Sequence, residues 1–252
     1  MAEFCIKIAG RVAAVTSLFD STRDYCRRYL TDREADFAVT VTREDLAFEQ
    51  QALLEEALGE GIKPRVFTDP FLDRAAIQRK VAEELFESGV LLFHGSTVAV
   101  DGEAYLFTAD CGTGKSTHTR LWRQVFGDRA VMVNDDKPFL KITEAGVLAC
   151  GAPWSGKHGL DSNITVPLKG ICILHRGSEN RIRPISAAEA MPMLRKQSVP
   201  PLDGGKLPDY DALVAALGQR CPLWEMHCTK DPEAALVAHE AMSGGTGCTE
   251  NV

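Results

Sequence analysis

The stretch TADCGTGKST at residues 108–117 limits the possible folds of this chain more than any other feature. An apolar run at 104–108 predicts a strand before it, and residues 115–126 predict a helix after it. Glycines between the two allow backbone N–H groups to curl around an anion, and the helix N-terminus adds unpaired donors and partial positive charge. The pattern therefore predicts a phosphate-binding loop, although the strict motif has glycine where Ala109 stands. In such a loop Lys115 reaches the terminal phosphates of a nucleotide and Ser116 binds Mg²⁺.

The other residues of this loop are expected to contact the phosphates mainly through their backbone. They are Cys111, Gly112, Thr113, Gly114 and Thr117. The position of Cys111 near a helix N-terminus favours sensitivity to oxidation, but we interpret it as a loop residue and not as a nucleophile.

A second apolar run, 130–133, ends in Asn134, Asp135 and Asp136. This order predicts carboxylates at the carboxyl end of a central strand, and in a parallel sheet the phosphate loop lies at the same edge. One carboxylate there can hold Mg²⁺, and the other can accept a proton from an attacking hydroxyl. The alternative interpretation is an ordinary turn or helix cap.

The segment GAPWSGKHG at 151–159 is too rich in glycine and proline for regular structure. Its aromatic and basic side chains, Trp154, Lys157 and His158, suit a substrate or nucleotide surface. The alternative is a turn with a half-buried tryptophan. Five further basic side chains are candidates for binding phosphate. Each could equally be a solvated charge on the surface. They are Arg120, Arg123, Lys137, Arg181 and Arg183.

Residues 1–89 predict a small α+β unit. Strands are expected at 4–8 and 36–42. A helix at 43–58 is capped by Thr42, with Asp45 adding charge to its first turn. A second helix opens at Asp69-Pro70 and continues to about residue 88.

Residues 90–185 predict a nucleotide-binding core, and residues 186–242 a C-terminal extension. The core strands are expected at 90–94, 96–100, 104–108, 130–133, 139–142, 147–150, 171–174 and 181–183. Asp101-Gly102 between two alternating runs predicts a hairpin. The extension is expected to contain helices at 186–197, 209–218 and 232–242 and a strand at 223–227. Residues 243–252 predict a flexible polar tail.

Charge and cysteine content narrow the class of protein. The 252 residues contain 28 basic and 35 acidic side chains, a net charge of −7 that disfavours nucleic acid as a partner. No apolar run approaches the roughly 20 residues that cross a bilayer, and the N-terminus does not resemble a signal peptide. Eight cysteines are scattered without metal-ligand spacing. We therefore expect a cytoplasmic protein with reduced thiols and no membrane partner.

Three motifs in this order and spacing resemble the kinase domain of the HPr kinase/phosphorylase family: His94-Gly95, the loop 110–116, and the run 134–136. The resemblance covers residues 90–185. It implies an α/β fold whose P-loop core is of the type shared with phosphoenolpyruvate carboxykinase, preceded here by the small N-terminal α+β unit.

The resemblance also implies roles for particular residues. Lys115 binds the transferring phosphates, and Ser116 and Asp136 hold Mg²⁺. Asp135 is the acid/base residue, and His94 polarises the reacting centre. The family further suggests a homo-oligomer.

Two departures from the family bear on the acceptor. The family's second signature, a strand with Glu and Arg before a glycine turn, is replaced by the segment 151–159, and the N-terminal unit differs from the usual regulatory domain. We therefore expect ATP- and Mg²⁺-dependent phosphorylation of a hydroxyl on a protein or peptide serine or on a small molecule. The donor can also be GTP or pyrophosphate. The alternatives are an ATP-binding switch that transfers nothing, and carboxykinase-type chemistry with a second metal held by Lys157 and His158.

Overall fold

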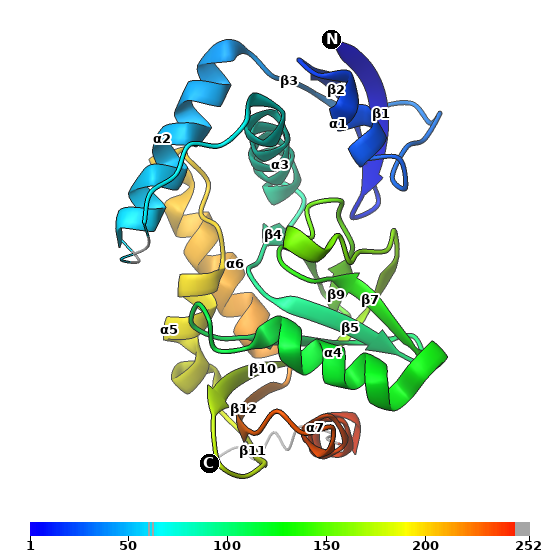
Figure 1. Ribbon diagram of the computed structural model, residues 1–252, viewed down its shortest axis with the longest axis vertical. Coiled ribbons are helices and arrows are strands. Elements are labelled where there is room, and N and C mark those ends of the chain that lie inside the picture. The colour runs from blue at the N-terminus through cyan, green and yellow to red at the C-terminus, as the bar shows by residue number, and fades with distance from the viewer. Residues whose placement is uncertain (60, 62, 245–252) are drawn as a thin grey trace. The chain divides into compact units, whose positions relative to one another are not determined.

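The computed structural model describes residues 1–59, 61 and 63–244 and divides into two compact units, one ending at Glu87 and the other beginning at Ser88. Figure 1 shows both as mixtures of helices and strands, so the chain has the expected mixed α/β character. Among the described residues, no helix is long and apolar enough to cross a membrane. Of the predicted tail, Ser243 and Gly244 belong to the last helix, and 245–252 lie outside the described residues.

The described part of the first unit contains a three-stranded sheet of order β1-β2-β3. Its elements are β1 (Ala2–Ile8), β2 (Arg11–Ser17), α1 (Asp20–Tyr25), β3 (Phe37–Thr40), α2 (Arg43–Gly59) and α3 (Asp69–Phe86). The sequence did not predict β2 or α1. The β1–β2 turn uses Ala9 and Gly10, both at positive φ (50° and 85°). Because alanine is uncommon at positive φ, the sequence carried only a weak turn signal there.

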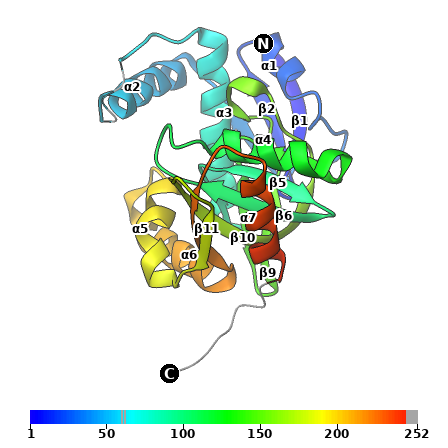
Figure 2. The ribbon, with the colours of Figure 1, turned by 60° about the horizontal axis from the view of Figure 1, so that its bottom comes forward.

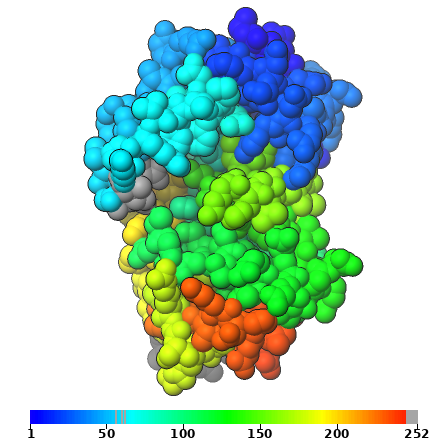
Figure 3. Space-filling model, viewed as in Figure 1, coloured from blue at the N-terminus to red at the C-terminus, as the bar shows by residue number. Residues whose placement is uncertain are grey.

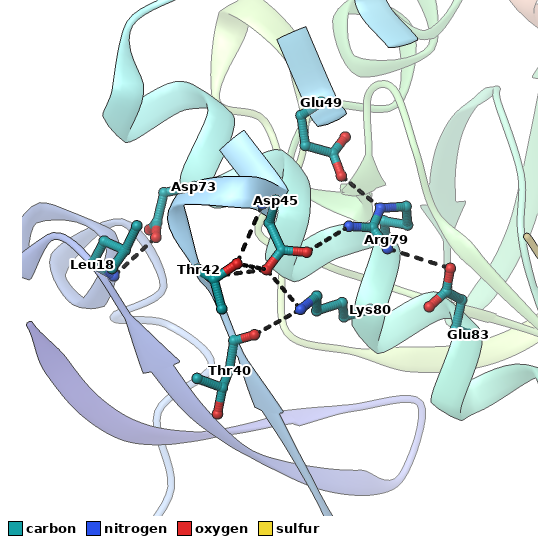
Figure 4. A network of polar contacts seen from close by, with 9 residues as sticks. All are labelled: Leu18, Thr40, Thr42, Asp45, Glu49, Asp73, Arg79, Lys80 and Glu83. Atoms are coloured by element: carbon teal, nitrogen blue, oxygen red, sulfur yellow. Dashed lines mark hydrogen bonds and ion pairs between the residues drawn. The ribbon is translucent and has the colours of Figure 1, made fainter. Parts of the chain in front are cut away.

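Asp73 of α3 is fully buried and fixes that helix to the end of β2. Its carboxylate accepts hydrogen bonds from Ser17 Oγ (2.7 Å), Leu18 N (2.9 Å) and Thr22 Oγ1 (2.6 Å). Figure 4 shows Asp73 directed at Leu18. A buried charge is tolerated when hydrogen bonds replace its hydration, so these donors stabilise both the carboxylate and the helix position.

A second polar group holds α2 against α3 (Figure 4). Thr42 caps α2 as expected, since its N–H donates to Asp45 Oδ2 (2.8 Å) and its hydroxyl accepts from Asp45 N (3.4 Å). From α3, Arg79 reaches Asp45 (3.1 Å) and Glu49 (2.6 Å), and Lys80 reaches Asp45 (2.7 Å). These ion pairs are largely shielded from solvent, and they lock the two helices together.

The described part of the second unit contains a nine-stranded mixed sheet with the path β4-β8-β9-β10-β6-β5-β7, to which β12 and β11 are added beside β10. The strands are β4 (Val90–Leu92), β5 (Ser96–Val100), β6 (Glu103–Thr108), β7 (Ala130–Asn134), β8 (Phe139–Thr143), β9 (Gly146–Cys150), β10 (Thr165–Arg176), β11 (Arg181–Pro184) and β12 (Leu223–Cys228). The first residues of β10 pair with β9, whereas later ones pair with β6 and β12. The long strand β10 therefore joins the two parts of a curled sheet.

The hairpin β5–β6 forms as predicted, with Asp101 and Gly102 at φ 52° and 85°. Strand β7 pairs antiparallel with β5, as β6 does, so β6 and β7 run in the same direction and end at the same edge. The prediction that Asp135 and Asp136 follow a central strand is wrong, because β7 stands at the end of the strand path. Residues 160–162 cover this end instead: Ser162 N donates to Val133 O (3.2 Å).

The longer helices of the second unit fall into two pairs: α4 (Lys115–Phe126) with α7 (Glu233–Gly244), and α5 (Ala187–Gln197) with α6 (Leu207–Arg220). Figure 2 shows α5 and α6 side by side. Helix α4 packs on β5, β6 and β7, while α6 contacts β8 and β9. Short 3₁₀ turns lie at Gly127–Arg129, Gly156–His158 and Gly204–Lys206. The bounds of α4 are those that the sequence predicted.

The buried carboxylate of Asp73 predicts a large effect of D73A. This change leaves three donors without their acceptor, and we expect the free energy of opening of α3 to fall by about 2–4 kcal/mol. Native-state hydrogen exchange of the α3 amides measures it. The matched control is D69A on the same helix, which removes an exposed ion pair with Arg43 (2.8 Å) and should cost about 1 kcal/mol or less. Equal effects of D73A and D69A would contradict the conclusion that the buried Asp73 carboxylate holds α3 in place.

Candidate functional site

A cavity of about 620 Å³ lies where β6 and β7 end. One wall is the glycine-rich loop with α4, and the other is the end of β7 with part of the segment 151–160. In Figure 3 the yellow-green surface of this segment lies next to the green surface of α4. Most residues that the sequence singled out line this cavity: His94, Gly112, Gly114, Lys115, Ser116, Thr117, Asp135, Asp136, Lys157 and His158. The cavity brings together motifs separated by up to 64 positions in the chain.

The loop conformation depends on its glycines. Gly112 and Gly114 have φ values of 74° and 126°, a region that side chains with a Cβ rarely adopt. Thr113 N donates to Asp110 O (3.2 Å) and closes a turn between them. Lys115 opens α4 and its Nζ donates to the carbonyl of Ala109 (3.1 Å) at the start of the loop. These two glycines, the turn and the Lys115 bond together give the loop its shape.

Three long side chains from other parts of the unit also hold this loop, and sequence reasoning missed them. Lys196 Nζ donates to Asp110 Oδ1 (2.7 Å), and Gln197 Nε2 donates to the carbonyl of Ala109 (3.3 Å). The Arg176 guanidinium donates to the carbonyls of Gly112 and Thr113. No local pattern marks these residues, because their partners lie 63 or more positions away in the chain.

Asp135 is buried, with 7% of its surface exposed, and still lines the cavity. Its Oδ1 accepts a hydrogen bond from Ser96 Oγ (2.7 Å), and Ser96 is hydrogen-bonded to Thr119 Oγ1 (2.7 Å). Strand β5 and helix α4 thus position the carboxylate. Neither Ser96 nor Thr119 belongs to a motif that is evident in the sequence. Among the described residues, Ser96 is the only side chain that donates to Asp135.

Asn134 determines where the two carboxylates lie. It is fully buried, and its amide Nδ2 donates to the carbonyls of Ala152 (2.8 Å) and Trp154 (3.1 Å). Its Oδ1 accepts from the backbone N–H groups of Asp136 (2.8 Å) and Lys137 (2.7 Å). One side chain therefore folds the turn after β7 and attaches residues 152–154 to it.

His94 contacts Asp136 and not Asp135: its Nε2 lies 3.3 Å from Asp136 Oδ1. Burial by itself raises the pKa of the Asp136 carboxyl. The hydrogen bond from His94 and the charges of Lys137 and Lys115 outweigh burial, so the pKa lies below its ordinary value of 3.8. Asp136 is consequently ionised at neutral pH.

The cavity wall carries more positive charge than a phosphate loop requires. Arg120, Arg123 and Lys157 line it, and within the described part of the chain none of the three side chains has an ion pair or a hydrogen bond. Two other candidate clamps are engaged elsewhere: Arg181 pairs with Glu179, and Arg183 pairs with Glu189 and Glu225. An anionic ligand is the natural complement of unpaired cations in a cavity.

Three predicted residues do not line this cavity. Cys111 is exposed on the loop, and Thr113 faces a second cavity on the other side of it. Trp154 is buried, with its ring 6.4 Å from that of Phe139. A contact of the Trp154 side chain with a substrate therefore finds no support in its position.

The oxygen ligands that Mg²⁺ prefers are present in the cavity wall. Ser116, Asp135 and Asp136 all line it. Within residues 1–59, 61 and 63–244 no cluster of three or more His, Cys, Asp or Glu could hold a metal alone. Mg²⁺ is usually held by one or two carboxylates together with substrate phosphates. The residues present fit that arrangement, and a second metal at Lys157 and His158 has no comparable set.

Comparison with protein families identifies the group to which the chain belongs. Residues 72–201, just over half of the sequence, match the family model described as SynChlorMet cassette protein ScmC, and the chain belongs to this family. No match was found among curated proteins. Among solved structures, the Hpr(Ser) kinase/phosphatase from Coxiella burnetii is similar over 61% of this chain and 99% of that one, with 13% identity. Its TM-score of 0.36 indicates only a distant structural relationship.

The contact between His94 and Asp136 predicts a pKa change in H94A. Removing the imidazole should raise the pKa of Asp136, because burial still acts and one stabilising hydrogen bond is lost. Carboxyl ¹³C NMR titration measures the change. The control is H158A, which alters the same cavity wall without removing a bond to Asp136. An unchanged or lower pKa in H94A would contradict the assignment.

The contact between His94 and Asp136 also contributes to the loss of folding stability at acid pH. Because the pKa of Asp136 is lowered in the folded state, its contribution to stability is complete above about pH 4 and is lost as the pH falls further. H94A should weaken that acid dependence.

Proposed function

We propose that this chain is an ATP- and Mg²⁺-dependent phosphotransferase that moves the γ-phosphoryl group to a hydroxyl of a protein, a peptide or a small molecule. One observation carries the proposal: the buried carboxylate of Asp135 faces the same cavity as the glycine-rich loop and Lys115. A module that only holds a nucleotide has no need of a positioned carboxylate beside the one that serves the metal.

The loop supplies the donor site. Backbone N–H groups around Gly112 and Gly114, with the N-terminus of α4, favour phosphate oxygens. Lys115 lies at the first turn of that helix, and its ammonium can exchange the carbonyl of Ala109 for a terminal phosphate. Mg²⁺, when bound, neutralises charge on the β- and γ-phosphates; Ser116 and Asp136 are the residues that would hold it.

Asp135 supplies the base. As the acceptor oxygen bonds to the γ-phosphorus, the bond from that phosphorus to the β–γ bridging oxygen breaks, and ADP departs. The hydroxyl proton passes to the Asp135 carboxylate. Ser96 holds Oδ1, which leaves Oδ2 as the oxygen available to the acceptor.

The remaining cations stabilise the charge that develops during transfer. In a phosphoryl-transfer transition state negative charge spreads over the equatorial oxygens, and fixed positive groups around them lower the barrier. Lys115, Arg120, Arg123 and Lys157 line the cavity and would serve this role. The cysteines are scattered along the sequence without metal-ligand spacing, which supports a cytoplasmic location for the reaction.

The donor site predicts that K115A loses tight binding of MgATP while the fold persists. Lys115 lies on a loop-to-helix junction and not in the core, so its loss removes a phosphate contact and little packing. Isothermal titration calorimetry measures the affinity, and thermal melting checks the fold. The control is K141A on β8, outside the cavity wall. Unchanged affinity in K115A would refute the phosphate-loop interpretation.

The two carboxylates predict different defects. D135N keeps the acceptor for Ser96 but removes the base, so nucleotide affinity should fall little while phosphoryl transfer falls by about 10²–10⁴-fold. D136N should weaken Mg²⁺-dependent nucleotide binding first. The measurements are nucleotide titrations with and without Mg²⁺, and transfer of labelled γ-phosphate to an acceptor found by screening.

The outcomes distinguish a catalytic base from a shared metal role and from a switch that transfers nothing. Equal losses of binding in both variants would mean that the two carboxylates share one metal role. Full transfer activity in D135N would remove the base from the proposal. A chain that binds MgATP and transfers to none of the screened hydroxyls, with D135N indistinguishable from the parent, would favour the switch.

A further inference from the structure

Positive charge lines the mouth of the first cavity. Arg120 and Arg123 come from α4, and Lys157 comes from the 3₁₀ turn at Gly156–His158 in the other wall. All three residues are exposed, whereas Asp135, which lines the same cavity, is buried. The three cations therefore lie at the rim of the cavity, and together they form what we call the basic rim.

Helix α4 shows where the basic rim lies relative to the proposed base. Thr119 Oγ1 is 2.7 Å from Ser96 Oγ, which in turn donates to Asp135 Oδ1 (2.7 Å). Asp135 therefore lies near the second turn of α4 and not at its N-terminus, where Lys115 stands. Arg123 follows Thr119 by one turn, which places it about 6 Å farther from the loop along the helix axis.

This order along α4 has a consequence for the acceptor. In phosphoryl transfer the attacking and leaving oxygens lie in line on opposite sides of the phosphorus. Since the donor phosphates occupy the loop around Lys115 in the proposed function, the acceptor approaches from the other side, where α4 carries Arg123. The charge of Arg123 adds to the field at the transferring group, and it is also available to a charged group on the acceptor.

The turn that carries Lys157 is fixed beside the second carboxylate. Gly156 has a φ of 68°, and a Cβ on it would lie 3.1 Å from the Cβ of Asp136. Glycine is the residue that suits both the positive φ and so close an approach. Lys157 therefore brings its charge to the carboxylate wall, facing the two arginines of α4.

The acids of the cavity do not neutralise the basic rim. Of the described residues that line it, only Asp135 and Asp136 are acidic, and these already have partners in Ser96 and His94. The basic rim is thus left for an anion from outside the chain. Small-molecule sites usually enclose most of their ligand, whereas the basic rim is exposed. A peptide chain that passes over the rim fits it better than a small molecule confined to the cavity.

We propose that the acceptor is an acidic peptide segment, in which a carboxylate lies within about three residues of the phosphorylated hydroxyl and binds to Arg123 and Lys157. An extended peptide advances about 3.3 Å per residue, so about two residues cover the roughly 6 Å between the base and Arg123, and side-chain length extends this to about three. The inference rests on the proposed phosphotransferase function and narrows its acceptor.

Binding and transfer test the acidic character separately. The probes are fluorescein-labelled peptides with a central serine, whose flanking residues are glutamate in one set and glutamine in the other. Fluorescence anisotropy with the full chain should show that the glutamate peptides bind about tenfold more tightly, equivalent to about 1.4 kcal/mol. Added salt should weaken this preference, because it screens exposed charges. Transfer of labelled γ-phosphate should favour the glutamate peptides about tenfold in kcat/KM.

Two charge reversals locate the preference. R123E and K157E should each lower the ratio of glutamate to glutamine peptide binding several-fold, and peptides with lysine at the same positions should bind R123E better than the parent. Because each ratio compares two peptides on one variant, a loss of chemistry common to both cancels. The matched control is R33E, the same reversal at an exposed arginine outside the cavity wall, which should leave the ratio unchanged. Thermal melting checks that the variants fold.

Equal binding of the two peptide sets by the unaltered chain would overturn the inference, as would a preference that R123E and K157E both retain. Transfer to small hydroxyl compounds but to no serine peptide would also overturn it and would leave the proposed function intact. Transfer to no hydroxyl of either kind would instead refute the proposed function, and the acceptor inference with it.

Discussion

The side-chain amide of Asn134 is completely buried, and its hydrogen bonds hold together the chain segments that form the first cavity. Two donated bonds attach residues 152–154, and two accepted bonds fold the turn that carries Asp136. A buried amide left without these partners would lose about 1–3 kcal/mol for each group. The carboxylates are thus set by a structural residue that itself faces no ligand. Gly151 reinforces the arrangement, because a Cβ there would lie 1.8 Å from the carbonyl oxygen of Ser162.

The chain as a whole is acidic, whereas part of the wall of the first cavity is basic. The whole chain carries a net charge of −7, yet Arg120, Arg123 and Lys157 line the first cavity without an ion pair to any described residue. Net charge governs long-range encounters, whereas a cavity responds to the groups that line it. The overall acidity therefore disfavours nucleic acid while leaving room for a small, highly charged anion. The two carboxylates in the same wall limit where an anion can lie. Under the proposed function, Mg²⁺ would lie between them and the phosphates.

Sequence reasoning succeeded where the signal was local. The turn at Asp101-Gly102, the bounds of α4 and the cap of α2 by Thr42 follow from neighbouring residues, and the structure confirms them. It failed for β2 and α1, since alanine at positive φ gives little turn signal. It also placed β7 at the centre of the sheet, because an apolar run looks the same whether other strands or a covering segment bury it. The roles proposed for the site residues remain predictions.

The sequence by itself determined that a glycine-rich turn joins a strand to a helix beginning with Lys115, because backbone freedom and helix start signals are properties of adjacent residues. Only the tertiary structure decided which groups meet that loop. Ser96 reaches Asp135 across 39 positions, and Arg176 reaches Gly112 across 64. Such contacts depend on strand order and direction, which hydrogen bonds between distant segments establish. The basic rim belongs to the same category: α4 supplies two of its cations and the turn at Gly156–His158 supplies the third, so no stretch of the chain encodes it alone.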